Sequence, residues 1–293
     1  MKMRAWALLP LLFVVAACGS SGSGQPASAA VVNGHQISME AYTAEFRQQR
    51  QSSIDTVGYD VCSIPSMKGL CAIIKKRSLN NVIDAELVRE YANRHGIAVS
   101  PTQDALVWKQ TFQRKFDNRR DVENIWLRRV GITEPDLRRG LHQDLLEQKV
   151  IYAVTAGLSS YQPSIDLAQI EVSDQKDLKQ VQAYLKRHIP FTSVAALTLR
   201  QNVPGCTAGQ CGVLGWTPDA FVPPNRKQLL SAPVGSVVGP IRQQLDWLLF
   251  QVEGRSAHVK LTARQLYQLR QLKFVAWIER QQKLAQVKEY VAV

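Results

Sequence analysis

The chain has 293 residues, and its 36 Lys and Arg against 24 Asp and Glu give a formal net charge of +12. The length exceeds that of one small domain and indicates two. A basic balance of this size favours anionic partners such as lipid head groups, cell-wall polymers or acidic proteins. The cations are scattered along the chain rather than gathered in a tail, so a solvated surface accounts for most of them.

The first residues have the pattern of an export signal. Lys2 and Arg4 precede an apolar run of about a dozen residues, shorter than the roughly 20 that a membrane-spanning helix needs. We expect residues 1–17 to be a cleaved signal peptide and Cys18 to carry lipid. Residues 18–30 are then the lipidated cysteine and a flexible Gly/Ser/Pro/Ala tether. The alternative is that Cys18 merely lies near an ordinary cleavage site. Export excludes nucleic acid as the partner of the basic surface.

Four cysteines follow Cys18 as two local pairs, Cys62 with Cys71 and Cys206 with Cys211. In an oxidising compartment this arrangement predicts two short-loop disulfides. Zinc is a weaker interpretation, because eight and four intervening residues without matching histidines do not fit its usual ligand spacing. Free thiols are the remaining alternative. We therefore predict neither a metal site nor a cofactor.

Residues 31–156 form a predicted helical domain. Asn33-Gly34 between short apolar runs is a strong hairpin signal. Beyond Ser38, a turn-rich loop over 55–71 interrupts the helical pattern. Capping residues and apolar periodicity predict helices over about 39–54, 75–94, 101–116, 121–130 and 134–153. The Trp, Phe and Leu residues on these helices are assigned to the core.

Gly, Ser and Pro at 157–163 mark a boundary before a second predicted domain, residues 163–254. Its predicted elements are a strand at 165–172, helices at 177–188 and 191–199, and strands at 237–241 and 247–252, with a polar turn at Arg242, Gln243 and Gln244. This order favours a compact α+β domain.

The last segment, 261–293, is predicted to contain a long amphipathic helix over 262–290. The small domain offers this helix no obvious partner, so we expect it to pack on the N-terminal helices. Its apolar side is expected to carry Leu266, Leu269, Leu272, Phe274, Trp277 and Ile278.

Several segments, taken in order, resemble a known family. The N-terminal chaperone domain of SurA- and PrsA-type extracytoplasmic foldases is resembled by Val31–Gly34, Asn81–Val88, Gly96–Ser100 and Gly131–Glu134. The rotamase domain of the same proteins, a parvulin, is resembled by Leu167–Val172, Phe191–Ala196, Gly212–Trp216 and Val234–Ile241. The resemblance implies an α+β fold in which the C-terminal helix completes a helical chaperone domain and a parvulin-like domain is inserted between. It also implies an apolar cradle for extended client segments.

A parvulin pocket carries two histidines, an acid or thiol, a Met or Leu, a Phe, and a Thr or Ser. The resemblance places Gln169 and Leu248 at the two histidine positions, Phe221 at the Met position, Asn225 at the Phe position and Gln243 at the hydroxyl position. The acid or thiol position falls in 201–204, which offers neither group. No catalytic residue is therefore assigned, and none of His35, His95, His142, His188 and His258 coincides with a parvulin position.

Trp216, Phe221 and Trp247 are the candidates for a small apolar peptide groove, the alternative being that they are ordinary core aromatics. We predict a membrane-anchored extracytoplasmic chaperone or foldase that binds unfolded exported polypeptides and has a degenerate parvulin domain. The first alternative is an active peptidyl-prolyl cis-trans isomerase that works through pocket shape. The second is an envelope-binding assembly lipoprotein whose basic surface binds anionic polymers. The resemblance also allows a homodimer.

Overall fold

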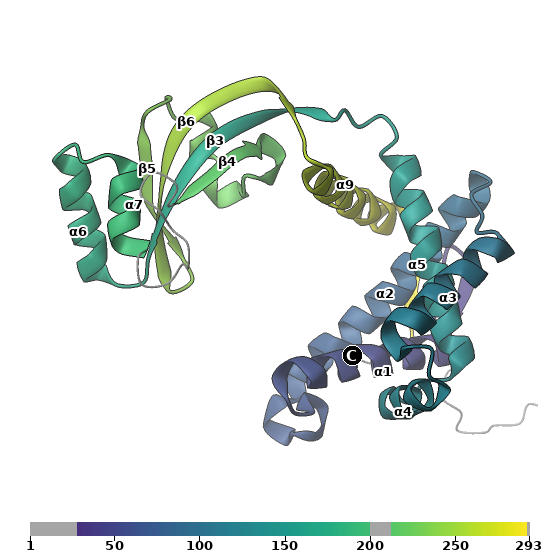
Figure 1. Ribbon diagram of the computed structural model, residues 1–293. Helices are drawn as coiled ribbons and strands as arrows, with labels where there is room; N and C mark the ends of the chain where they lie inside the picture. The colour runs from purple at the N-terminus through teal and green to yellow at the C-terminus, as the bar shows by residue number, and fades with distance from the viewer. Residues whose placement is uncertain (1–27, 200–211, 292–293) are drawn as a thin grey trace, which may run out of the picture. The chain divides into compact units, whose positions relative to one another are not determined.

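The computed structural model describes residues 28–199 and 212–291 (Figure 1). The predicted signal peptide, Cys18 and most of the tether lie outside the described residues. So do Cys206, Cys211 and the parvulin acid or thiol position. The described residues combine helices with two antiparallel sheets, which confirms the predicted α+β class.

The chain forms two compact units. Of the described residues, the first unit takes 28–86, 120–136 and 285–291, and the second takes 87–119, 137–199 and 212–284. The second unit continues without a break through residues 156, 163, 254 and 261, where the sequence sets its domain limits. Those limits stay a prediction.

The first unit contains a three-stranded sheet of order β2-β1-β7, made of β1 (Ser28–Val32), β2 (His35–Ser38) and β7 (Val287–Glu289). Asn33 and Gly34 form the turn between β1 and β2, with φ values of 49° and 88°. A two-residue hairpin turn of this kind requires positive φ, which Asn and Gly tolerate best. The predicted hairpin is confirmed.

The tether is shorter than the sequence predicts, because residues 28–30 belong to β1. This strand lies between its two neighbours in the sheet, and Ala29 and Ala30 are fully buried. Small side chains fit a central strand that has a neighbour on each side. The same small residues beside Gly and Ser have the composition of a linker, which is why the sequence predicts a longer tether.

The predicted helix over 262–290 is wrong at its end. The helix stops at Leu284, and the backbone N–H of Gln286 then donates to Oδ1 of Asn33 at 2.9 Å. In return the N–H of Asn33 donates to the carbonyl of Gln286, also at 2.9 Å. These bonds direct the chain into β7, which pairs with β1.

The helices of the first unit are α1 (Met39–Val57), α4 (Arg120–Val130) and the first part of α2 (Lys68–Arg94). Oγ of Ser38 accepts the N–H of Ala41 at 3.1 Å and caps α1, which ends at Gly58 with a φ of 84°. The loop predicted over 55–71 is shorter than expected, because two 3-10 turns, Val61–Ser63 and Pro65–Met67, lead directly into α2.

The second unit contains the rest of α2 together with α3 (Pro101–Phe116), most of α5 (Glu134–Val154) and α9 (Ala263–Leu284). A complete capping box starts α3: Oγ of Ser100 accepts the N–H of Gln103, and the Gln103 side chain accepts the N–H of Ser100. The predicted start and end of this helix agree with the structure.

Four residues of α9, Leu269, Phe274, Trp277 and Ile278, are buried. The ring of Trp277 meets that of Tyr91 on α2 edge to face, with centroids 5.0 Å apart. The expected packing of the C-terminal helix on a helix of the N-terminal half is therefore observed. Leu272 was assigned to the apolar side but is 43% exposed, because it lies on the other side of α9 from this contact.

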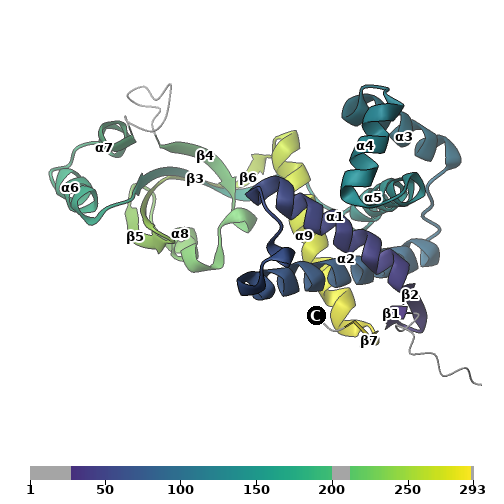
Figure 2. The ribbon, with the colours of Figure 1, turned by 90° about the horizontal axis from the view of Figure 1, so that it is seen from below.

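The rest of the second unit is a four-stranded antiparallel sheet of order β4-β3-β6-β5 with three helices (Figures 1 and 2). Its elements are β3 (Tyr161–Val172), α6 (Gln175–Lys186), α7 (Phe191–Leu199), β4 (Val213–Pro218), α8 (Gln228–Ser231), β5 (Val237–Gln243) and β6 (Asp246–Lys260).

The sheet differs from its prediction in two places. Strand β4 was not predicted, because Gly212 and Gly215, with φ values of 76° and 71°, break the alternation that marks a strand. Arg242 and Gln243 belong to β5 rather than to a turn, which consists of Gln244 and Leu245.

Both faces of this sheet are covered by apolar side chains. On one face α6 and α7 pack against Ala168, Ile170, Val172 and Leu249. The opposite face, named the α8 face after the helix that contributes Leu229, is closed by a cluster of Ile165, Leu167, Leu229, Leu248, Phe250 and Val252.

Candidate functional site

The α8 face of the sheet holds Gln169 and Leu248, the two residues that the resemblance aligns with parvulin histidines. Gln169 is half-buried, and its amide donates to the carboxylate of Glu171 at 3.2 Å. Leu248 is 1% exposed within the apolar cluster of this face. The guanidinium of Arg226 lies 5.2 Å from the ring centroid of Phe250 in the same cluster. Apolar side chains therefore surround Leu248, the residue that the resemblance aligns with the second histidine.

The other family positions are spread over turns and a strand end. Phe221 is half-buried in a 3-10 turn, Asp219–Phe221, and Asn225 is exposed in the next one, Pro224–Arg226. Gln243 is exposed at the end of β5, paired with Asp246. None of the three contributes a group that titrates near neutral pH, so they supply no acid or base for catalysis.

The two tryptophans proposed for a groove are far apart. Trp216 on β4 pairs with Asp166 and is 39% exposed, and a Cβ on Gly254 would lie 3.2 Å from its Cη2. Trp247 pairs with Val172, six residues along β3, which is about 20 Å at the rise of a strand. It packs against the core under α6 and α7, and the guanidinium of Arg242 lies 4.7 Å from its ring.

Because Trp247 and Leu248 are neighbours on one strand, they point to opposite faces of the sheet. The structure therefore does not bring Trp216, Phe221 and Trp247 together around the family positions.

A cavity of about 300 Å³ lies between α3 and α5, in a place that sequence reasoning missed. Nδ1 of His142 is 3.0 Å from both carboxylate oxygens of Asp104. The guanidinium of Arg138 stacks 3.9 Å from the ring centroid of Trp108. The i, i+4 spacing of 104 with 108 and of 138 with 142 is the one signal in the sequence, since it places each pair on one side of its helix. The lining is completed by Arg139 and Leu141.

The family model of the SurA-like N-terminal domain matches residues 2–151, about half of the chain. The chain belongs to this SurA-like family. Among curated proteins, none matches the SurA-like chain significantly.

Solved structures give a more distant likeness. A peptidylprolyl isomerase, PrsA of Bacillus anthracis, has 17% identity and a TM-score of 0.42, over 70% of the SurA-like chain and 95% of that chain. The foldase PrsA of Streptococcus pneumoniae has 16% identity and a TM-score of 0.38, over 70% and 77%. A structure from work on the SurA-like chaperones PEB4 and Cj1289 of Campylobacter jejuni has 11% identity and a TM-score of 0.33, over 91% and 100%. The family assignment rests on the family model, because TM-scores below 0.5 do not establish a common fold.

Within residues 28–199 and 212–291, no helix of the SurA-like chain combines the length and apolarity needed to cross a membrane. Over the same residues, no group of three or more His, Cys, Asp and Glu side chains is arranged to hold a metal ion.

Proposed function

We propose that this chain is a membrane-anchored, extracytoplasmic chaperone that holds unfolded exported polypeptides. The observation that carries the proposal is the SurA-like family match over residues 2–151. The Campylobacter proteins compared above are described as SurA-like chaperones, and we infer the same kind of activity here. A family of this kind works by binding extended apolar segments rather than by changing covalent bonds.

Export and anchoring are part of the proposal. Residues 1–17 have the pattern of a signal peptide, and Cys18 is the proposed lipid-carrying residue. The Sγ atoms of Cys62 and Cys71 are 2.12 Å apart, which is the separation of a disulfide. A disulfide there supports export, since such bonds persist in oxidising compartments. We propose a second disulfide between Cys206 and Cys211.

We propose further that the parvulin-like sheet domain has lost isomerase chemistry. Rotation about an X–Pro bond has an uncatalysed barrier of roughly 18–20 kcal/mol, and catalysis requires groups that favour the twisted amide over the planar one. Leu248 offers an alkyl group inside a closed cluster, and the Gln169 amide is engaged with Glu171. Neither residue can donate or take up a proton as a histidine does.

The exposed side of α9 is our proposed client contact in the second unit. Leu272 and Val275 are 43% and 49% exposed, and they lie three residues apart on the side of the helix away from the buried Trp277. Apolar side chains at this spacing offer a sequence-tolerant surface, because the hydrophobic effect is non-directional.

Two assays on the chain from residue 19 onward, which keeps every described residue, test the proposal. The first is suppression of aggregation of an unfolded client, and the second is prolyl isomerisation of a short peptide. We expect suppression without isomerisation above the uncatalysed rate. Leu272→Asp should weaken suppression several-fold, whereas Leu245→Asp is the control. Leu245 is 77% exposed in the β5–β6 turn, so this substitution adds the same charge to another exposed leucine.

Isomerisation well above background, lost in Phe221→Asp, would contradict the chaperone-only proposal and establish an active site on this domain. Failure of both assays would contradict the chaperone itself. A salt-dependent pull-down on anionic envelope polymers would then test the remaining alternative, because salt weakens contacts between exposed charges.

A further inference from the structure

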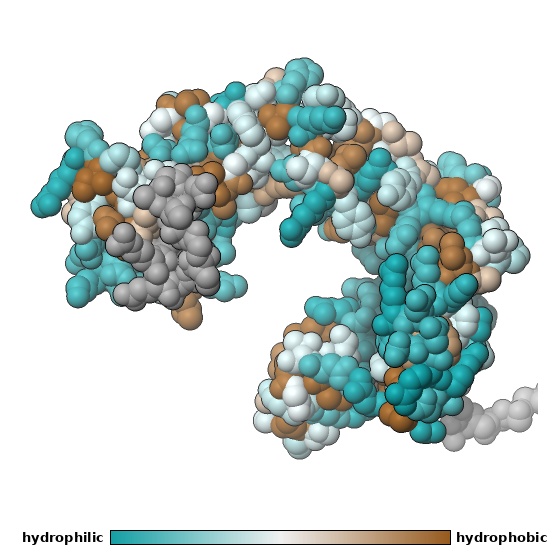
Figure 3. Space-filling model, in the orientation of Figure 1, coloured by the Kyte–Doolittle hydropathy of each residue, from teal (hydrophilic) through white to brown (hydrophobic). Residues whose placement is uncertain are grey.

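A second apolar surface lies at the end of the α1–α2 pair, in the first unit. It is formed by Val57, Tyr59, Leu70 and Ile73, which are 45%, 45%, 51% and 57% exposed, and we call it the α1–α2 tip. Figure 3 shows hydrophobic residues gathered around this end of the two helices. Single exposed apolar side chains are common on protein surfaces. Four of them within the 17 residues from 57 to 73, at the end of two neighbouring helices, form a patch.

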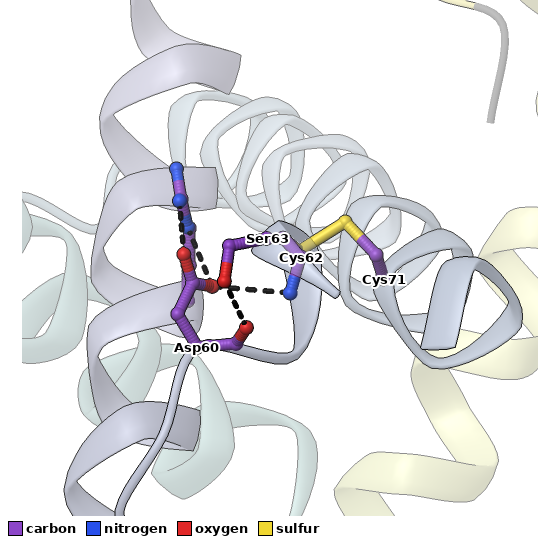
Figure 4. Close-up of polar contacts among 5 residues, drawn as sticks. Asp60, Cys62, Ser63 and Cys71 are labelled. Atoms are coloured by element: carbon purple, nitrogen blue, oxygen red, sulfur yellow. Dashed lines mark hydrogen bonds and ion pairs between the residues drawn. A yellow bond between two sulfur atoms is a disulfide. The ribbon is translucent and has the colours of Figure 1, made fainter. Parts of the chain in front are cut away.

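The tip is held in a fixed conformation. The guanidinium of Arg50 donates two hydrogen bonds to the Asp60 carboxylate, one of them at 3.0 Å through Nε. The same carboxylate accepts the backbone N–H of Cys62 at 3.1 Å, and Oγ of Ser63 donates to the carbonyl of Asp60 at 2.8 Å (Figure 4). Cys62 is joined to Cys71 at the start of α2. The loop between the two helices that carry Val57, Leu70 and Ile73 is therefore pinned, and the helix ends beside it are not frayed.

The charge around the tip is positive. Residues 61–83 contain no acid, and their four cations are Lys68, Lys75, Lys76 and Arg77. Lys76 is paired with Glu289, whereas the other three cations form no ion pair among the described residues. Arg77 follows Leu70 and Ile73 at the i, i+3, i+7 spacing of one helix face, so an exposed cation continues the apolar face.

The two acids closest in sequence to Val57 and Tyr59, which are Asp55 and Asp60, do not offset this charge. The Asp55 carboxylate is 3.5 Å from the guanidinium of Arg129, and Asp60 is bound to Arg50. Each acid is thus already neutralised by an arginine of its own. An anionic partner therefore meets uncompensated cations beside exposed apolar side chains.

We propose that the α1–α2 tip docks on an anionic lipid surface as a second membrane contact of the protein. Apolar side chains enter the boundary between head groups and acyl chains, tyrosine suits that boundary, and nearby cations attract anionic lipids. A second copy of the chain is a poorer occupant, because a twofold interface would bring the same cations together. The proposal rests on the proposed export and anchoring, and it is independent of client binding.

The geometry allows both contacts to be made at once. Helix α1 has 19 residues and is about 28 Å long, so the tip lies about that far from the start of the helix beside β1. The ten residue steps from Cys18 to Ser28 span at most about 35 Å. The chain between anchor and fold is long enough for the tip to reach the same membrane.

Vesicle flotation of the chain from residue 19 onward tests the tip without the lipid anchor. We expect binding to phosphatidylcholine vesicles that contain one third phosphatidylglycerol, little binding to pure phosphatidylcholine, and loss of binding at high salt. Ile73→Asp should weaken binding to the anionic vesicles roughly tenfold, because it removes an inserting side chain and adds a repelled charge. The control is Ile125→Asp on α4, which alters an isoleucine that is 59% exposed against 57% for Ile73.

Circular dichroism establishes that both variants are folded before they are compared. Equal weakening by the two substitutions, or no binding of the unaltered chain to anionic vesicles, would overturn the proposal. If Ile73→Asp reduced suppression of client aggregation but left vesicle binding unchanged, the tip would be a client site and the lipid proposal would be wrong. Because vesicle binding needs no client, its failure is distinct from failure of the chaperone assay.

Discussion

Introducing histidine at position 248, where the resemblance places a parvulin histidine, is a direct test of whether the sheet domain can support catalysis. Leu248 is 1% exposed among Ile165, Leu229, Phe250 and their neighbours. Leu248→His removes a buried alkyl side chain, worth about 2–3 kcal/mol, and leaves imidazole polar atoms without partners, which costs about 1–3 kcal/mol. We expect a loss of about 3–6 kcal/mol in the free energy of unfolding, and no gain in isomerisation.

Urea unfolding followed by near-ultraviolet circular dichroism measures this loss. Leu248→Ala is the control, because it creates the cavity without the buried polar ring and should cost about 2–5 kcal/mol. The two variants should also differ in their dependence on pH. Below about pH 6 the unfolded chain binds a proton that the buried imidazole of Leu248→His does not bind, so the stability of that variant falls further while that of Leu248→Ala does not.

A Leu248→His protein with the stability of the unaltered chain and a raised isomerisation rate would refute the reasoning. Such a result would mean that the α8 face opens to admit substrate and that the apolar cluster is not a closed core. The substitution Gln169→His provides a comparison for Leu248→His. Gln169 is half-buried and bound to Glu171, so the substitution should alter stability by less than Leu248→His does.

Three further changes test the helices α1, α2 and α3 and the loop between α1 and α2. Cys62→Ser with Cys71→Ser should lower the free energy of unfolding by about 2–3 kcal/mol, the loop-closure value for their separation of nine residues. Denaturation with and without reductant should reproduce this difference. Hydrogen bonds from Arg50 hold the pKa of Asp60 below its ordinary value, so the pair stabilises the fold above about pH 4 and ceases to do so as the pH falls through that lowered pKa. Asp60→Asn should therefore cost about 1 kcal/mol at neutral pH, and a pH series should show the difference from the unaltered chain shrinking below pH 4. Ser100→Ala removes the cap of α3 and should cost about 1 kcal/mol in thermal or urea unfolding, whereas an effect near zero would mean that the capping box contributes nothing.

Local signals in the sequence predicted local structure well. Asn33-Gly34 determined a hairpin turn, and Ser38 and Ser100 marked helix starts that the structure shows with their capping hydrogen bonds. Each of these features depends on residues within four positions of one another. The physical cause is therefore contained in a short window of sequence.

Features that depend on distant partners were missed. The pairing of β7 with β1 joins residues more than 250 positions apart. No pattern in residues 285–290 predicts a strand. The same holds for the contact of Asp104 with His142, which are 38 residues apart on two helices. The family resemblance identified Leu248 as a replaced position, but only the fold shows that the replacement closes an apolar core.

The filled α8 face changes what the sheet domain must do physically. A catalytic pocket holds polar groups beside an open apolar cavity, an arrangement that generally lowers stability. Here Leu248 and Phe250 are about 1% exposed, and Leu229 of α8 packs against them. Such a face is stabilised by close packing and need not open. In the chaperone proposed above, a domain built in this way would act as a rigid insertion between α5 and α9, to which β3 and β6 connect. Selection on this sheet would then act on packing rather than on chemistry, which is the change that separates a chaperone from an isomerase on one fold.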